Sequence, residues 1–330
     1  MNSIGQLFRV SVFGESHGEC VGVIIDGVPA GLTINIDDFN IDIERRKGGL
    51  QKGTTARKEE DIPILKSGVF NNKSTGAPLT ILFENKNIKS SDYSEQRNIP
   101  RPGHADFVAS KKFGGYEDFR GSGHFSGRLT LCLVAAGVIA KKLLSNITIV
   151  SKLIEVGGET DIEKGIEKAI QEKDSVGGII ECKTVGLPIG LGEPFFNSVE
   201  SLISHAIFSI PAVKGIEFGS GFSSTKMFGS EHNDSIIDNT GQTKTNHSGG
   251  IVGGLSNGNE LVFRVAIKPT SSTPKAQESY NVETDKIENF TVYGRHDLCI
   301  ALRVPVVVEA VTVIVLADLM ILEQRIKRII

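Results

Sequence analysis

The sequence lacks the residue patterns that mark several large classes of protein. Its four cysteines, Cys20, Cys132, Cys182 and Cys299, form no C-x-x-C pair, and no H-E-x-x-H motif occurs, so we expect no metal site. Neither the G-x-x-x-x-G-K-[ST] of a P-loop nor the G-x-G-x-x-G of a dinucleotide fold is present. The cysteines are expected to be free, buried thiols of a protein in a reducing compartment.

An excess of charge of either sign is also missing. Lys and Arg number 36 against 39 Asp and Glu, which gives a net charge of -3 and no basic field to attract nucleic acid. The basic residues are not interleaved with aromatic ones, as a single-strand nucleic-acid groove requires. The N-terminus, MNSIGQLFRV, carries no signal-peptide pattern. We therefore expect a cytoplasmic protein without a nucleic-acid partner.

A single long apolar stretch, residues 304–322, has the length of a membrane span. It contains Glu309 and Asp318, and each charge would cost about 2.5–3.5 kcal/mol at the centre of a bilayer. We expect a buried core element instead, and no membrane partner. The basic residues Arg325, Lys327 and Arg328 would suit the C-terminal end of a helix there.

The remaining hydrophobic pattern predicts an α+β protein. Strands are predicted at residues 8–13, 21–25, 62–70, 78–84, 178–184, 213–218 and 261–267, and helices at 36–43, 105–113, 127–144, 162–172 and 198–208. The helix at 127–144 is apolar on all sides, which indicates a central position. No linker is evident, so residues 1–330 are expected to form one domain, although the likeness of residues 21–26 to 176–181 also allows two related halves.

The pentapeptide Gly14–Gly18, G-E-S-H-G, supports two incompatible interpretations. Its letters match G-x-S-x-G, the strand–turn–helix elbow that presents a nucleophilic serine in hydrolases. Residues 20–25, however, form a β-type run rather than a helix, so Ser16 is not expected to be a nucleophile. His17 is then either a turn histidine bonded to the backbone or a general acid that titrates near neutral pH.

Cations and glycines recur in four further loops. Arg45, Arg46 and Lys47 precede Gly48-Gly49, where they either end a helix or bind an anion. His104 follows Arg101-Pro-Gly just before a predicted helix, whose dipole would favour a neutral imidazole. That histidine either caps the helix or exchanges a proton.

The third and fourth loops are the glycine-rich residues 120–128 and the hydroxyl-rich residues 268–273. The first enters a predicted helix and can cradle an anion, and the second places Lys268 beside three hydroxyl groups. Residues 294–297 add Arg295 and Asp297, either in a site or as a surface ion pair. Each loop could also be an ordinary turn, but together they indicate an enzyme that holds more than one phosphorylated molecule.

Ordered long motifs resemble the chorismate synthase family from end to end. They are residues 5–18 (GQLFRVSVFGESHG), 25–32 (IDGVPAGL), 44–49 (ERRKGG), 67–70 (SGVF), 101–106 (RPGHAD), 126–130 (SGRLT), 212–215 (AVKG), 246–254 (NHSGGIVGG), 268–272 (KPTSS) and 294–299 (GRHDLC), with Glu309 beyond them. The resemblance implies a sandwich of antiparallel β-sheets around a helical core and a homotetramer.

The resemblance also implies a reaction and its cofactor. Family members eliminate phosphate and a ring proton, in the 1,4-anti sense, from 5-enolpyruvylshikimate-3-phosphate, and thereby catalyse the last common step toward the aromatic amino acids. They require reduced FMN, which NADPH or a separate flavin reductase supplies. A non-catalytic flavin- or nucleotide-binding module is the alternative, and a serine hydrolase is the third hypothesis.

Roles follow from the positions that match the family's motifs. His17 would protonate the leaving phosphate, His104 would act on the reduced flavin, and Asp297 would assist deprotonation. The positions implied for substrate or NADP binding are Arg45, Arg46, Lys52, Arg101 and Arg128. Those implied for FMN are His124, Phe125, Ser126, Pro211, Ala212, Gly253, Lys268, Pro269, Thr270, Ser271, Ser272 and Arg295.

The sequence departs from the common family pattern at several of these positions. Lys47 and Gly48 stand where many members have Arg-Pro, and Lys52 stands where others carry arginine. His124 and Phe125 replace the Arg-Ser of R-S-S-A-R. A lysine cannot reproduce the bidentate contacts of a guanidinium, so these changes concern anion binding most directly.

Overall fold

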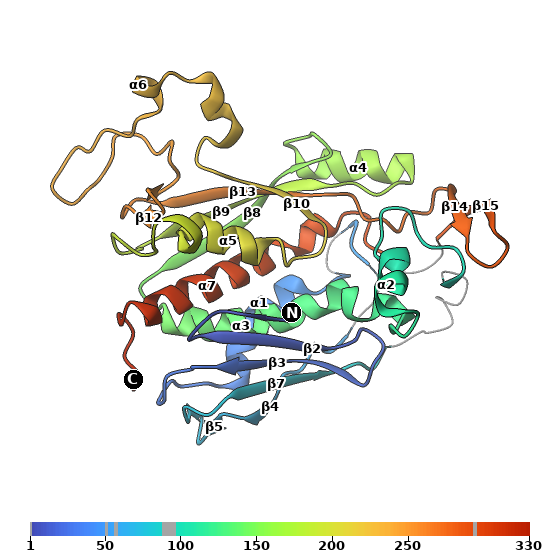
Figure 1. The fold of residues 1–330 in the computed structure, drawn as a ribbon, viewed down its shortest axis with the longest axis horizontal. Coiled ribbons are helices and arrows are strands. Elements are labelled where there is room, and N and C mark those ends of the chain that lie inside the picture. Colours follow the sequence, from blue (N-terminus) through green and yellow to red (C-terminus); the bar gives the residue numbers. More distant parts are fainter. Residues whose placement is uncertain (1, 50–51, 56–58, 88–96, 293–295) are drawn as a thin grey trace.

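Two antiparallel sheets enclose a layer of helices in this protein (Figure 1). The computed structural model describes residues 2–49, 52–55, 59–87, 97–292 and 296–330. This arrangement confirms the predicted α+β sandwich around a helical core. The prediction of one domain with two related halves stays a prediction, although the two similar segments both lie in interior strands of their sheets, β3 and β9.

The first sheet has the strand order β1-β2-β3-β7-β4. Its strands are β1 (Ser3–Ile4), β2 (Arg9–Gly14), β3 (Cys20–Asp26), β7 (Leu79–Glu84) and β4 (Ile64–Ser67). Within it, β2 and β3 form a hairpin in which Gly14 pairs with Val21. Alternate residues of β7 are buried, as the period of two predicts for a sheet with one face on the core.

The second sheet has the order β10-β13-β9-β8. Its strands are β10 (Val213–Phe218), β13 (Leu261–Ile267), β9 (Gly178–Val185) and β8 (Thr148–Val156). Three short hairpins stand apart from both sheets: β5 (Val69–Phe70) with β6 (Lys73–Ser74), β11 (Ile251–Val252) with β12 (Leu255–Ser256), and β14 (Gln277–Asn281) with β15 (Lys286–Phe290). The sequence did not predict β8 or the 277–290 hairpin.

The helices are α1 (Asn40–Arg46), α2 (Asp106–Phe113), α3 (Thr130–Leu143), α4 (Ile162–Glu172), α5 (Val199–Ile207), α6 (Gly229–His232) and α7 (Pro305–Leu322). Of these, α3 and α7 pack against each other between the sheets (Figure 1). Gly137 makes the close approach possible, because a Cβ there would lie 2.5 Å from the Cβ of Ala310.

Helix α7 confirms the predicted buried core element, since nearly its whole length is buried. It ends at Leu322, so Arg325, Lys327 and Arg328 lie beyond the helix rather than at its C-terminal turn. Two helical stretches, Arg120–Leu143 and Pro305–Leu322, are long and apolar enough to span a membrane, but their windows are 67% and 78% buried inside the molecule. The core helix of a globular protein passes the same test.

Candidate functional site

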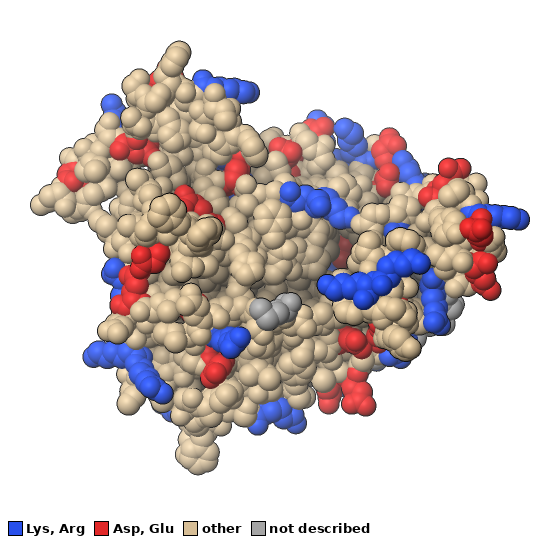
Figure 2. Space-filling view, in the orientation of Figure 1, with Lys and Arg blue, Asp and Glu red and all other residues tan. Residues whose placement is uncertain are grey.

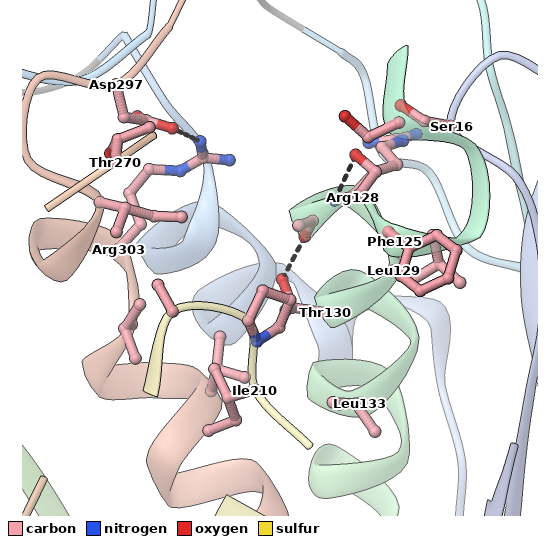
Figure 3. A pocket seen from close by; sticks show the side chains of 18 of the residues that line it. Ser16, Phe125, Arg128, Leu129, Thr130, Leu133, Ile210, Thr270, Asp297 and Arg303 are labelled. Atoms are coloured by element: carbon pink, nitrogen blue, oxygen red, sulfur yellow. Dashed lines mark hydrogen bonds and ion pairs between the residues drawn. The ribbon is translucent and has the colours of Figure 1, made fainter. Parts of the chain in front are cut away.

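A cavity of about 970 Å³ lies where β1 and β2 of the first sheet, the end of α1, the starts of α3 and α7 and several loops meet. Figure 3 shows Asp297, Arg303 and Thr270 on one side, Ser16, Arg128 and Phe125 on the other, and Ile210 and Leu133 lower down. The face drawn in Figure 2 carries basic side chains interspersed with acidic ones and no continuous basic field. The volume suits ligands of drug or cofactor size.

Most of the predicted site residues line this one cavity, although they come from distant parts of the chain. They are Arg46, Arg101, His104, His124, Phe125, Ser126, Arg128, Pro211, Ala212, Lys268, Pro269, Thr270, Ser271, Ser272 and Asp297. The cavity therefore joins the loops that the sequence could identify only separately.

The Gly14–Gly18 turn connects β2 directly to β3, so the strand–turn–helix of a nucleophile elbow does not form there. The glycine-rich loop packs on this turn: the amide of Ser16 donates to Gly123 O at 3.1 Å, and His124 Nδ1 donates to Gly14 O at 2.9 Å. The two most distinctive loops of the sequence are thus one structural unit.

His17 is only 5% exposed and lies behind the cavity wall, while its neighbour Ser16 lines the cavity. Gly121 covers the imidazole so closely that a Cβ on this residue would be 2.3 Å from His17 Cδ2. Gly121 also has φ of 57°, a conformation that glycine adopts at little cost. A glycine is therefore required here for the histidine to approach the cavity.

His104 precedes α2, as predicted, and sits in a network of hydrogen bonds. Its Nδ1 lies 2.6 Å from Asp106 Oδ1 and 3.1 Å from Arg101 Nη2, and its Nε2 lies 3.3 Å from Ser122 Oγ. Arg101 donates to Asp106 and to Ser122. Burial alone would raise the pKa of Asp106, but hydrogen bonds from Arg101 and His104 hold this pKa well below its usual range.

Two buried arginines share one buried carboxylate. Arg46, at the end of α1, and Arg128, just before α3, are 3% and 7% exposed, and both pair with Asp61. Burial and then the nearby Arg303 lower the pKa of Arg46 to about 9, so the group remains charged at neutral pH. One negative charge between two positive ones leaves this part of the wall cationic.

Asp297 is held as an acceptor rather than exposed in a surface ion pair. Its carboxylate accepts from Arg303 Nη1 at 2.9 Å and from the amide of Thr55 at 2.9 Å. Arg303 Nε also donates to the carbonyl of Arg46 at 2.9 Å, which ties the Asp297 region to the end of α1. The 294–297 motif and the arginine-rich motif therefore meet through Arg303.

Loop 268–272 carries a cation and hydroxyl groups into the cavity. Lys268 Nζ donates to Gly103 O at 2.7 Å and to Ser271 Oγ at 2.8 Å. Partial burial, and then Lys214, lower the pKa of Lys268. The hydroxyl oxygen of Thr270 is buried and has no hydrogen-bond partner among the described residues. Such an orphaned group is expected where a polar ligand completes the site.

Besides His17, three predicted residues lie away from the cavity lining, and one is not described. Arg45 points to the helical core and binds Glu309, whereas Lys52 is 64% exposed and lies 3.4 Å from Glu167. Gly253 is in the turn between β11 and β12. Arg295 falls outside the described residues. The assignment of these four to binding stays a prediction.

Sequence reasoning missed four residues that organise the site: Asp61, Asn85, Ser122 and Arg303. Ser122 lies within the glycine-rich loop 120–128, which was identified without its partner, and Arg303 lies only six residues from Asp297, whereas Asp61 and Asn85 pair with Arg128 over 67 and 43 positions. The one local feature that marks Asp61 is its left-handed φ of 52°, and this is visible only in the structure. In the described part of the chain, no group of three or more His, Cys, Asp and Glu could hold a metal.

Fold and site together define the class of the protein: an α+β enzyme with a cationic, histidine-containing cavity for small molecules. The family model for chorismate synthase matches residues 8–321. The chain is 66% identical over 330 residues to the chorismate synthase of Chitinophaga pinensis, covering 100% of this chain and 99% of that protein. A second such protein, from Dehalococcoides mccartyi, is 46% identical over 349 residues, with 96% of each chain covered.

A solved chorismate synthase structure matches as well. It has a TM-score of 0.75 and 25% identity, with 97% of this chain and 93% of that chain covered. The chain therefore belongs to the chorismate synthase family, whose members are lyases.

Proposed function

We propose that the chain catalyses the 1,4-anti elimination of phosphate and a ring proton from 5-enolpyruvylshikimate-3-phosphate, which yields chorismate. Family membership and the 66% identical relative support this activity. The observation that carries it is the convergence of Arg46, Arg128, Lys268 and His104 on one cavity. A C–O bond to phosphate and a C–H bond break, and a new C=C bond forms, so atoms and electrons balance without net oxidation.

The departing phosphate carries negative charge, and the arginines are placed to stabilise it. Arg46 and Arg128 are fixed by Asp61 before any ligand binds, and preorganised cations act most strongly in a site that excludes water. His17 is proposed as the acid that protonates the phosphate, since its imidazole packs directly against Gly121, which lines the cavity.

Family membership implies a flavin cofactor, and we propose that it is reduced FMN. The orphaned Thr270 hydroxyl, with Lys268 and Ser271, suits the oxygen atoms of such a ligand. Lys268, Thr270 and Ser271 would hold this group, and a bound reduced flavin would supply electron density to the site.

The chain's own groups would then hold protons at defined atoms. His104 would use Nε2, which lies 3.3 Å from the cavity-lining Ser122 Oγ, because Nδ1 contacts Asp106 and Arg101. Asp297 is kept as a fixed acceptor by Arg303 and Thr55. The remaining FMN contacts proposed are His124, Phe125, Ser126, Pro211, Ala212 and the 268–272 loop, with Gly253 and Arg295 kept as predictions.

The proposal extends to assembly, reductant and location. We propose one integrated domain in a cytoplasmic homotetramer, with flavin reduced by NADPH on the enzyme or by a separate reductase. Several exposed phenylalanines support self-association, because isolated chains rarely expose so many large apolar side chains: Phe195, Phe196, Phe222 and Phe228 are 85%, 92%, 80% and 79% exposed.

One anaerobic assay tests the activity. The protein is mixed with the phosphorylated substrate and chemically reduced FMN, and chorismate and inorganic phosphate are measured together. Equal amounts of both products are expected. Flavin binding without either product would instead favour the non-catalytic binding module. A parallel reaction with oxidised FMN and NADPH tests whether the chain reduces its own flavin.

A further inference from the structure

The side chain of Asn85 spans two parts of the site that are otherwise separate. Asn85 follows β7 directly and is 9% exposed. Its Nδ2 donates to Glu15 O at 3.0 Å and to Gly18 O at 2.9 Å, and its Oδ1 accepts from Arg128 Nε at 3.0 Å. The carboxamide of Asn85 therefore hydrogen-bonds both to the turn that carries His17 and to Arg128 in the cavity wall.

The chemistry of these contacts admits asparagine and few other residues. The two backbone carbonyls require donors, while the guanidinium requires an acceptor, and a carboxamide offers both on one rigid plane. The backbone amide of Asn85 also donates to Glu19 O at 3.1 Å, so the side chain starts from a fixed position beside β3. Every side-chain hydrogen-bonding atom of the residue is thus used.

The positions of the neighbouring wall residues indicate what this contact fixes. Ser16, next to His17, and Arg128 appear on the same side of the cavity in Figure 3. The turn is also held to the glycine-rich loop, through Ser16 and His124. Small displacements of an acid relative to the group it protonates are costly in rate.

We propose that Asn85 is a positioning residue, which fixes the His17 turn relative to Arg128 and so aligns the proton donor with the anion site. The proposal rests on the proposed function for the roles of His17 and Arg128. It predicts that loss of the two donors slows turnover more than it weakens substrate binding, since Arg128 can keep its acceptor.

Asn85→Asp is the sharpest test, because it keeps the shape and the acceptor for Arg128 but removes both donors. The carbonyls of Glu15 and Gly18 then face a carboxylate. We expect kcat to fall by about 10–100-fold, as for other residues that orient a catalytic group, and KM to change by less than about three-fold. The ring NMR signal of His17, assigned with His17→Gln, is expected to shift.

Asn259→Asp is the matched control. Asn259 Nδ2 donates to Gly241 O and Asn257 Oδ1, and its Oδ1 accepts from the amide of Thr243, each at 3.1 Å, away from the cavity lining. We expect a lower unfolding temperature for this variant, with wild-type kcat and an unmoved His17 signal.

Two outcomes would overturn the proposal. In the first, Asn85→Asp keeps the wild-type kcat and the wild-type His17 signal. In the second, Asn259→Asp shows the same loss of kcat and the same His17 shift as Asn85→Asp. If Asn85→Asp does not fold, as judged by circular dichroism, Asn85→Gln keeps the amide on a longer side chain, and the same His17 shift with a smaller loss of kcat is expected. Wild-type protein that forms no chorismate would refute the proposed function, while the His17 signal would still decide the role of Asn85.

Discussion

The helical core and the cavity wall both bury charged side chains, but they balance them differently. In the core, Glu309 of α7 is 2% exposed and accepts two hydrogen bonds of 2.7 Å from Arg45 and one of 2.9 Å from Lys141. Asp42 pairs with the same two cations. Burial would raise the pKa of Glu309, but Arg45 and Lys141 hold it below its usual value. Two cations face two carboxylates, so no charge is left for a ligand.

In the part of the cavity wall around the end of α1, three arginines face two carboxylates. Arg46 and Arg128 share Asp61, and Arg303 pairs with Asp297. The excess positive charge is costly for the isolated fold and becomes useful only when an anion binds. The difference teaches that balanced buried charges hold elements together, while unbalanced ones mark a binding site. Arg45 belongs to the balanced network of the core, whereas its neighbour Arg46 belongs to the cavity wall.

Removal of the core carboxylate should have the largest effect on stability. Glu309→Ala leaves Arg45 and Lys141 with Asp42 as their remaining partner, so we expect the free energy of unfolding to fall by about 3 kcal/mol, the lower end for a broken buried ion pair. Denaturant unfolding, monitored by circular dichroism at constant protein concentration, measures this change. A loss below about 1 kcal/mol would show that the core network is not structural.

Substitution of the two neighbouring arginines separates binding from structure. Arg46→Met should lower kcat/KM by about 10–100-fold, because the charged group proposed to stabilise the leaving anion is lost. Arg45→Met keeps the apolar stem and should lower mainly the unfolding temperature. Steady-state kinetics on both variants measure the split, and equal losses of kcat/KM would remove the distinction between core and wall.

Gly121→Ala tests the tight contact over His17. The variant combines backbone strain of about 1–2 kcal/mol at φ of 57° with a Cβ that clashes with the imidazole. Gly158→Ala is the control, since Gly158 has φ of 84° and an added methyl group there would meet nothing within 4 Å. We expect both variants to lose stability, and only Gly121→Ala to lose turnover. Comparable kcat in the two would show that His17 needs no such clearance.

The loss of folding stability at acid pH should depend on Asp106. Its folded pKa is depressed, so its contribution to stability is complete above the unfolded pKa of about 3.9 and is lost as the pH falls further. The wild-type free energy of unfolding should therefore fall below about pH 4, by about 1–3 kcal/mol more than that of Asp106→Asn. Parallel pH–stability curves for the two proteins would contradict this prediction.

The smallest expected effect is that of a thiol reagent on the native protein, because the buried cysteines of the core should not react with it. Burial raises the pKa of Cys132 and Cys182 to about 12 and that of Cys299 to about 11. All four are free, as predicted, but Cys20 is partly exposed, so the prediction that it is buried was wrong. Iodoacetamide at pH 8 should modify Cys20 alone in the native protein, which mass spectrometry of peptides detects. Modification of Cys132 without denaturant would show that the core opens.

The elements that the sequence predicted well are those with strong local patterns. Residues 162–172 and 213–218 form α4 and β10 with the predicted bounds, because their hydrophobic period is clear. Strand β8 was missed although it is rich in β-branched residues, and the 277–290 hairpin is mostly polar and has little apolar pattern to detect. The helix predicted from residue 127 begins in α form only at Thr130, after a 3-10 turn.

Within the site, the sequence could identify motifs but not partners. His17, His104 and Asp297 stand in recognisable motifs, and the latter two line the cavity. Asp61 and Asn85 could not be found, since their importance lies in contacts with Arg128, 67 and 43 positions away. Local patterns carry no information about such long-range pairs.

By itself, the sequence determined the family, the α+β class and the loops that carry chemistry, because motifs and hydrophobic periods are local properties of the chain. Only the tertiary structure decided that Arg45 stabilises the core while Arg46 faces the cavity. It also decided that His17 lies behind Gly121 and that Asn85 connects its turn to Arg128. These outcomes depend on which distant surfaces pack together, and the charge balance of a site exists only once they do.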